Sequence, residues 1–281
     1  MVQVKSVEER NLPSGLFDWR VEKPLDHDGV IVGCNGSHEW MLPWWWVNFR
    51  LHNDYPVTFF DFGGMTESAK SWCKARGQLV TLEIPVDLFL AKREAVSETV
   101  KPSWEGDKGS DVWEARPNWF KKPFACLHSP YKRTLWIDLD CQVRKPVADL
   151  FDYCDNRLGI SVAREPDEII KFYFEEGRIF ADEIEYNTGV VAFKHGSVLI
   201  VDWAKECVEK NHYLRGDQEV LTRLFYEKKI TPFALLPEYN SRWHGGLSAD
   251  TVIIHWLGAG KGEIRNQIHA LQSMALMDLS I

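Results

Sequence analysis

Short apolar runs alternate with helical patterns in the first third of the chain, and this alternation limits the fold more than any other feature. Three runs have the length and composition of buried strands: residues 29–34, 56–62 and 78–84. Helical patterns at 38–51 and 66–75 separate them. Because short apolar strands that alternate with helices form parallel βαβ units, the pattern predicts an α/β domain.

The same alternation continues later in the chain, with two interruptions. Further strands are expected at residues 134–137, 159–163, 187–193 and 251–254. Further helices are expected near residues 117–128, 198–209, 217–226 and 263–276. The polar segment 88–116 is either a flap or a pair of small surface helices, and the acidic stretch 164–185 resembles an insertion. One domain over 29–281, preceded by a peripheral extension over 1–28, fits this order best.

Charge and cysteine content exclude several classes of protein. The chain has 281 residues and a net charge of -8, which argues against broad binding of nucleic acid. Its six cysteines form no C-x-x-C pair and are expected to be reduced thiols in the core. No apolar leader and no transmembrane segment is recognised, so a cytoplasmic protein is expected.

The triplet Asp138-Leu139-Asp140 directly follows the apolar run 135–137. In an extended chain, residues i and i+2 point to the same side, so both carboxylates can bind one divalent cation. Such a cation can hold a diphosphate and neutralise it as a leaving group. The other D-x-D triplet, Asp26-His27-Asp28, lies in a polar stretch with no strand before it and is interpreted as a turn.

His255 and two lysines are further candidates for this site. His255 ends the strand at 251–254, and a nitrogen ligand favours Mn²⁺ over Mg²⁺. Taken alone, a histidine in this position is more often part of the core. Lys122 and Lys261 can place ammonium groups on phosphates, although both can also be ordinary surface lysines, and Lys121 is adjacent to the first.

The end of the first strand and a tryptophan-rich helix complete the candidate features. At Gly33-Cys34-Asn35, a small residue allows a nucleotide to approach the backbone, although a simple turn explains the glycine equally well. In the helix at 38–51, the residues Trp40, Trp44, Val47 and Leu51 share one face and are expected in the core.

The segment from Lys122 to Phe151 resembles the glycogenin-like and galactosyltransferase-like retaining glycosyltransferases of the GT-A fold (glycosyltransferase family 8). Lys122 precedes the D-x-D at the family's spacing, and Asp149-Leu150-Phe151 matches its D-L-F. Later islands follow in the family's order: Asn187-Thr188-Gly189-Val190, Gly216-Asp217-Gln218, Leu236-Pro237, Tyr239-Asn240, and His255 with Gly258 and Lys261. The chain departs from the family after Lys261, where Gly262-Glu263 replaces Pro-Trp.

The resemblance implies a single GT-A domain with a Rossmann-like mixed sheet flanked by helices. Its nucleotide-binding half would span 29–140, and its acceptor-binding half with the C-terminal helix would span 141–281. The implied reaction moves a hexose from a UDP-sugar to an acceptor hydroxyl of a carbohydrate, lipid or protein, with retained configuration and Mn²⁺, or alternatively Mg²⁺. The acceptor and the oligomeric state are left open.

The resemblance also assigns roles to residues. The metal ligands would be Asp138, Asp140 and His255. The donor would contact Gly33, Cys34, Asn35, Lys122, Asp138, Leu139, Asp140, Gly189, Gly258 and Lys261. Asn187, Asp217 and Gln218 would surround the transferred sugar, with Asp217 or Gln218 as nucleophile unless attack occurs on the same face.

Two other functions fit parts of the sequence. A phosphohydrolase of the haloacid-dehalogenase type also uses a D-x-D at a strand end, but its motif favours Thr or Val where this chain has Gln142. A non-catalytic carbohydrate-binding module would explain the 13 tryptophans. Turnover of p-nitrophenyl phosphate would indicate the first, and sugar binding without nucleotide or metal would indicate the second.

Overall fold

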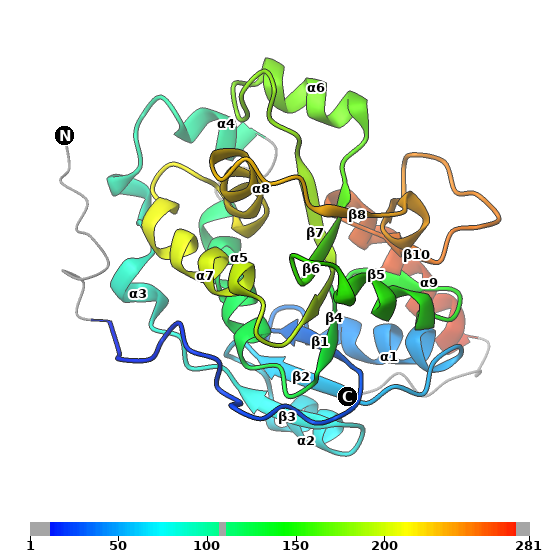
Figure 1. The fold of residues 1–281 in the computed structure, drawn as a ribbon. Helices are drawn as coiled ribbons and strands as arrows, with labels where there is room; N and C mark the ends of the chain where they lie inside the picture. The colour runs from blue at the N-terminus through cyan, green and yellow to red at the C-terminus, as the bar shows by residue number, and fades with distance from the viewer. Residues whose placement is uncertain (1–11, 107–110, 274–281) are drawn as a thin grey trace.

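A mixed sheet forms the centre of the molecule in the computed structural model, which describes residues 12–106 and 111–273. Within these residues, seven strands pair in the order β3-β2-β1-β4-β7-β6-β8 (Figure 1). They are β1 (Gly29–Cys34), β2 (Val57–Asp61), β3 (Gln78–Thr81), β4 (Arg133–Ile137), β6 (Ile160–Arg164), β7 (Tyr186–Lys194) and β8 (Phe233–Leu235). The first four are parallel, whereas β7 runs antiparallel to both β4 and β6. The predicted mixed α/β sheet is confirmed.

Helices cover both faces of this sheet. One face carries α1 (Leu42–Arg50), α2 (Glu67–Lys74), the 3-10 helix η4 (Ala148–Asp155) and α9 (Lys261–Ser273). The other carries α3 (Val86–Phe89), α5 (Asp111–Leu127), α7 (Val198–Lys210) and α8 (Asp217–Glu227). The remaining helices are η2 (Glu39–Met41), η3 (Arg93–Ala95), α4 (Lys101–Gly106), α6 (Asp167–Glu175), η5 (Pro237–Tyr239) and η6 (Gly258–Gly260).

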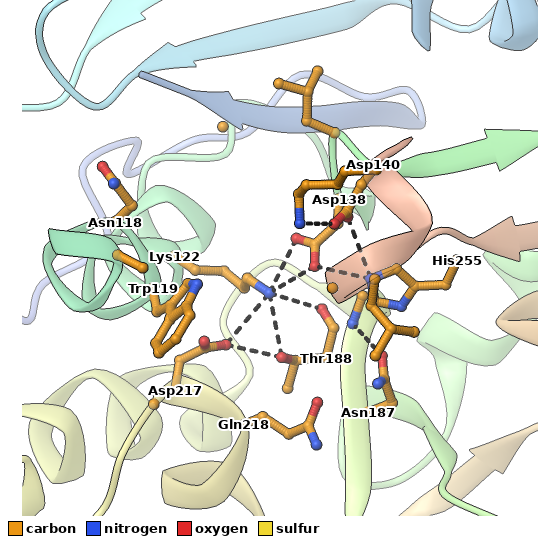
Figure 2. A pocket seen from close by; sticks show the side chains of 18 of the residues that line it. Asn118, Trp119, Lys122, Asp138, Asp140, Asn187, Thr188, Asp217, Gln218 and His255 are labelled. Atoms are coloured by element: carbon orange, nitrogen blue, oxygen red, sulfur yellow. Dashed lines mark hydrogen bonds and ion pairs between the residues drawn. The ribbon is translucent and has the colours of Figure 1, made fainter. Parts of the chain in front are cut away.

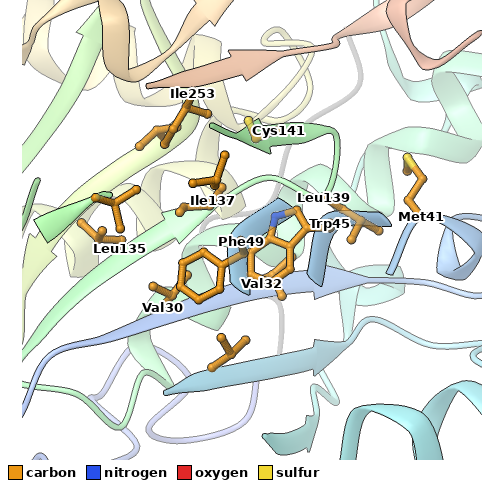
Figure 3. Close-up of a cluster of buried hydrophobic side chains, with 14 of the residues drawn as sticks. Val30, Val32, Met41, Trp45, Phe49, Leu135, Ile137, Leu139, Cys141 and Ile253 are labelled. Atoms are coloured by element: carbon orange, nitrogen blue, oxygen red, sulfur yellow. The ribbon is translucent and has the colours of Figure 1, made fainter. Parts of the chain in front are cut away.

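Alternation along the strands produces two separate cores. In β1, Val30 and Val32 face the α1 side, whereas Ile31 faces the α5 side, because successive side chains leave a strand on opposite faces. Figure 3 shows the first core, in which Trp45 stacks on Phe49 at 5.3 Å between ring centroids.

The predicted core face of the tryptophan-rich helix is partly wrong. Trp44 and Trp45 are both fully buried, so the core extends beyond the predicted stripe. Leu51, which was expected in that stripe, is 64% exposed because α1 ends one residue earlier, at Arg50.

A second, three-stranded sheet was not predicted, and it determines where the chain's last strand lies. It contains β5 (Cys141–Val143), β10 (Ile253–His255) and β9 (Ser241–Arg242), with β10 in the middle. The antiparallel pairing of β10 with β5 sets His255 opposite Cys141. This pairing brings His255 close to the end of β4, from which it is separated by more than a hundred residues in the sequence.

Both interruptions contain helices. The segment 88–116 contains η3, α4 and the start of α5, so short helices describe it better than a flap, although residues 107–110 lie outside the described part. Helix α5 begins at Asp111, earlier than predicted. The insertion 164–185 carries α6, none of whose side chains is buried.

Residues 12–28 run along the domain rather than away from it. Leu16 is 2% exposed, and Leu25 forms an isolated bridge with Tyr131. All six cysteines are free and buried, as expected for reduced core thiols. Within the described ranges, no helix combines the length and the apolar character that crossing a membrane requires.

Candidate active site

A cavity of about 990 Å³ opens at the carboxyl ends of β1 and β4. Because β7 is antiparallel to β4, its first residues lie at the same edge, and the second sheet adds the end of β10. Every residue predicted for the site lines this cavity, including Gly33, Cys34, Asn35, Leu139, Gly189 and Gly258. Figure 2 labels Lys122, Asp138, Asp140, Asn187, Asp217, Gln218 and His255 in it. Their individual roles remain predictions.

The two aspartates of the D-x-D are held by backbone on either side. The N–H of Asp138 donates to the Gly189 carbonyl at 2.8 Å, and the carbonyl of Asp140 accepts from the N–H of Trp256 at 2.9 Å. The Asp138 Oδ1 also accepts from the indole of Trp136 at 2.6 Å. The triplet is therefore fixed to both sheets before any ligand binds.

His255 lies across from both carboxylates. Its Nε2 is 3.3 Å from Asp140 Oδ1 and 3.8 Å from Asp138 Oδ2. The ring packs directly on Gly189, where a Cβ would come within 2.3 Å of two ring atoms. The histidine thus occupies space that only a glycine at 189 leaves open.

Two lysines neutralise the aspartates. Lys122 Nζ lies 3.0 Å from Asp138 Oδ1 and 3.4 Å from Asp217 Oδ2, and Lys261 Nζ lies 2.6 Å from Asp140 Oδ2. Burial would lower the pKa of Lys122, but the neighbouring carboxylates raise it well above its ordinary value. Burial would likewise raise the pKa of Asp140, yet the ammonium group of Lys261 holds it well below its usual range.

Lys122 rather than Lys121 belongs to the site. Lys122 Nζ also donates to the carbonyl and the hydroxyl of Thr188, at 3.1 and 3.2 Å. Lys121 instead donates to the carbonyl of Phe62 and does not line the cavity. The two neighbours leave α5 in different directions, which the sequence alone left ambiguous.

Asp217 and Gln218 begin α8 at the opposite wall. The buried Asp217 accepts from the Thr188 hydroxyl at 2.9 Å, and burial raises its pKa. The amide nitrogen of Gln218 donates to Glu185 at 2.8 Å. Asn187, on β7, hydrogen-bonds Glu165 on one side and the Gly189 N–H on the other, each at 2.8 Å.

The donor set fits a divalent cation. A carboxylate of Asp140, the thiol of Cys141 and the imidazole of His255 place ligand atoms within 4.8 Å of one another. The Cys141 thiol, however, is fully buried and donates to the Gly189 carbonyl at 3.7 Å. Burial raises its pKa well above the ordinary value, and a thiol is a softer ligand than the oxygen donors that Mg²⁺ and Mn²⁺ favour.

At the end of β1, the glycine has a packing role. A Cβ at Gly33 would come within 2.3 Å of Phe62 and 2.8 Å of Trp136, whose rings stack at 6.3 Å between centroids. Gly33 therefore makes room for two aromatic rings that form the floor of the cavity, in addition to any approach of a nucleotide.

Several cavity residues were not predicted from the sequence. They are mainly aromatic or basic side chains from α5, α6, the segment directly after α6, and β9: Trp119, Phe172, Tyr173, Arg178 and Arg242. No short motif contains them. For Trp119 the only local signal is its spacing three residues before Lys122, on the same face of α5.

Comparison with known proteins identifies the fold. No protein-family model matches the chain, and no curated protein matches it in sequence. Among solved structures, it is similar to the galactosyltransferase LgtC in complex with donor and acceptor sugar analogues, with a TM-score of 0.56 and 15% identity over 83% of this chain and 87% of that one.

Two other solved structures agree. Mouse xyloside xylosyltransferase 1 gives a TM-score of 0.51 and 15% identity over 82% of this chain and 97% of that one. GlyE from Streptococcus pneumoniae TIGR4 gives 0.54 and 15% over 83% and 55%. The chain therefore has the GT-A glycosyltransferase fold that its motifs resemble, rather than that of a haloacid dehalogenase.

Proposed function

We propose that the protein is a metal-dependent, retaining glycosyltransferase that moves a hexose from a UDP-sugar to an acceptor hydroxyl. One observation carries the proposal: two aspartates, one histidine and two lysines from distant segments meet in one cavity of a GT-A fold. Together these groups support a nucleoside-diphosphate site more strongly than any single motif does, because the diphosphate needs a cation and further positive charge.

We assign the metal ligands to Asp138, Asp140 and His255 rather than to Cys141. Two carboxylates and an imidazole suit Mn²⁺, and Mg²⁺ is the alternative, whereas a soft thiol ligand suits neither. When bound, the cation would neutralise charge on the departing UDP.

Lys122 and Lys261 would bind the phosphates. Each already pairs with a carboxylate of the D-x-D, so a cation on those carboxylates would free the ammonium groups for the diphosphate. Thr188 holds Lys122 by two further hydrogen bonds, which keep its ammonium group inside the cavity.

The wall formed by Asp217 and Gln218 would face the transferred sugar. The carboxylate of Asp217 forms an ion pair with the ammonium group of Lys122, and the amide nitrogen of Gln218 donates a hydrogen bond to Glu185. Retention of configuration follows from the family resemblance. Asn187 would act beside the sugar through the groups that it orients, because its amide oxygen already accepts two hydrogen bonds.

The test is turnover of a UDP-sugar by the double variant Asp138→Asn/Asp140→Asn. We expect a loss of at least about a thousandfold, the order of magnitude of losing charge stabilisation at a leaving group. The matched control is Asp26→Asn/Asp28→Asn, which makes the same change in the other D-x-D, where the aspartates pair with Lys132 and Arg133. Equal turnover in both double variants would refute the proposal.

The donor is identified by thermal-shift or NMR screening of UDP-glucose, UDP-galactose and UDP-N-acetylglucosamine with Mn²⁺ present. A stabilisation that requires both nucleotide and metal supports a transferase. Binding of free sugar without either would instead support a carbohydrate-binding module.

A further inference from the structure

A buried carboxylate behind the cavity starts a continuous chain of hydrogen bonds that ends at His255. Glu165 directly follows β6 and is 2% exposed. Arg242 donates to both of its oxygens, from Nε at 2.7 Å and from Nη2. Because a guanidinium has only donors, both oxygens of Glu165 act as acceptors.

The orientation of the next residue is fixed from two sides. Asn187 Nδ2 donates to Glu165 Oε1 at 2.8 Å. Its Oδ1 accepts from the Gly189 backbone N–H at 2.8 Å and from Asn240 Nδ2 at 2.9 Å. A backbone N–H can only donate, so the amide of Asn187 has one possible orientation.

The last link determines which nitrogen of His255 carries the hydrogen. With its Nδ2 facing Asn187, Asn240 turns its Oδ1 to His255 Nδ1 at 3.1 Å. An amide oxygen can only accept, so Nδ1 carries a hydrogen, and in the neutral ring this hydrogen is the only one on a ring nitrogen. The lone pair of Nε2 then faces Asp140 and Asp138, at 3.3 and 3.8 Å.

The nearest carboxylates, those of Asp140 and Asp138, favour the other tautomer. Without a cation between them, an Nε2–H that donates to Asp140 would be the more favourable neutral form. The chain of amides therefore stabilises the form that presents a lone pair, which is the form that a metal ion requires.

We propose that Glu165, Asn187 and Asn240 are positioning residues that hold His255 in its Nδ1–H tautomer and so make Nε2 available to a cation. The inference rests on the proposed function only for the identity of that cation. The tautomer itself is a property of the metal-free protein.

Two variants at one position separate orientation from simple packing. Asn240→Ala removes the acceptor opposite Nδ1, whereas Asn240→Asp keeps one there. The matched control is Asn53→Ala: Asn53 is 6% exposed against 8% for Asn240, and its amide bonds only Phe49 and Val147 in this region, remote from the cavity.

The first readout is the nitrogen-15 NMR spectrum of the His255 ring in metal-free protein, at a pH where the ring is neutral. The second is the affinity for Mn²⁺, measured by electron paramagnetic resonance titration. We expect Nδ1–H in wild type, Asn53→Ala and Asn240→Asp, and a shift to Nε2–H in Asn240→Ala. Mn²⁺ affinity should fall about 10–100-fold in Asn240→Ala alone.

Wild-type His255 with its hydrogen on Nε2 would overturn the inference, as would an Asn240→Ala variant that keeps the wild-type tautomer. Equal loss of Mn²⁺ affinity in the Ala and Asp variants would also overturn it. Such a result would mean that the acceptor opposite Nδ1, which only the Asp variant keeps, does not matter for metal binding. An Nδ1–H tautomer in a wild-type protein that binds no Mn²⁺ would support the chain of hydrogen bonds from Glu165 to His255. It would contradict the proposed function instead.

Discussion

Gly189 shows how one missing side chain determines the geometry of the site. It lies on β7 beside Asp138, and the ring of His255 fills the space where its Cβ would be. The sequence motif around it predicted a residue near the donor. The structure adds a steric reason for the glycine, because any larger residue must displace the imidazole.

Gly189→Ala should therefore weaken metal binding without unfolding the protein. A Cβ at 2.3 Å from the ring forces His255 to shift, and disturbing a ligand's support typically costs about 10–100-fold in metal affinity. Calorimetric titration with Mn²⁺ measures this. Gly262→Ala is the control, since its Cβ would meet no atom within 4 Å. Equal affinities in the two variants would contradict the steric account.

Glu185 makes stability depend on pH in a direction opposite to that of most carboxylates. It is fully buried, and burial together with the charge of Glu219 raises its pKa to about 8. In the unfolded chain the value is about 4.3. Between these values the folded state keeps a proton that the unfolded state has released, so this group lowers the free energy of unfolding as pH rises.

Glu185→Gln should remove that pH dependence. The amide keeps an oxygen for the hydrogen bond from Gln218 and cannot ionise. We expect the variant to gain stability relative to wild type progressively from about pH 5 to pH 8, with no further gain above it. Urea denaturation at several pH values measures the difference, and parallel stability curves would contradict the assignment.

The hydrogen bonds between several buried polar residues could not be predicted, for a physical reason. Glu165, Asn187 and Asn240 lie far apart in the sequence, and each alone resembles a turn or strand-end residue. Their roles arise from hydrogen bonds that form only when β6, β7 and the segment before β9 meet. Sequence spacing contains no information about such tertiary pairs.

Among the α-helices of the described residues, α6 is the only one without a buried side chain. Phe172 is 41% exposed and lines the cavity, whereas Phe174 on the same helix is 49% exposed and does not. Figure 1 shows α6 at the edge of the molecule, beyond the ends of β6 and β7. Because Phe172 lines the cavity from this exposed helix, we expect the insertion 164–185 to contact the acceptor.

Phe172→Ala should raise KM for the acceptor about threefold to tenfold, as expected from about 0.5–1.5 kcal/mol per aromatic contact. Hydrolysis of the donor without acceptor should not change, because the metal and phosphate groups are untouched. Steady-state kinetics with a chosen acceptor measures both. Phe174→Ala serves as the control, and an identical effect of the two variants would exclude a specific contact.

The elements that were missed share one property. Strands β5, β8 and β9 have two or three residues each, too few to show the alternation by which strands are recognised. By contrast, β1, β2 and β4 have five or six residues, mostly apolar, and were predicted within one or two positions. Short length explains the missed strands only in part, because β10 (Ile253–His255) also has three residues and was predicted from the apolar run Val252–Ile254.

At the scale of the whole molecule, the order of the strands in the sheet was less predictable than the positions of the longer strands in the sequence. The sequence indicated alternating strands and helices, but not that β7 lies between β4 and β6. That antiparallel insertion sets the start of β7 beside the end of β4, where Asp138 and Gly189 hydrogen-bond. The motifs were recognised through family resemblance, and the topology explains why they meet.

The molecule carries a net charge of -8, whereas the cavity contains charged side chains of both signs. Inside it, Lys122 and Lys261 are balanced by Asp138, Asp140 and Asp217, so the free site is not strongly positive. Binding of a diphosphate should consequently depend on the cation, since the lysines alone are already paired. This dependence is the central claim of the account.

Calorimetric titration of UDP into the wild-type protein, with Mn²⁺ and then with a chelator in its place, tests that claim most directly. We predict saturable binding with a single site in Mn²⁺ and a loss of at least about tenfold in affinity with the chelator, equivalent to about 1.4 kcal/mol. Equal affinity in both conditions, or no binding in either, would contradict a cation held by Asp138, Asp140 and His255.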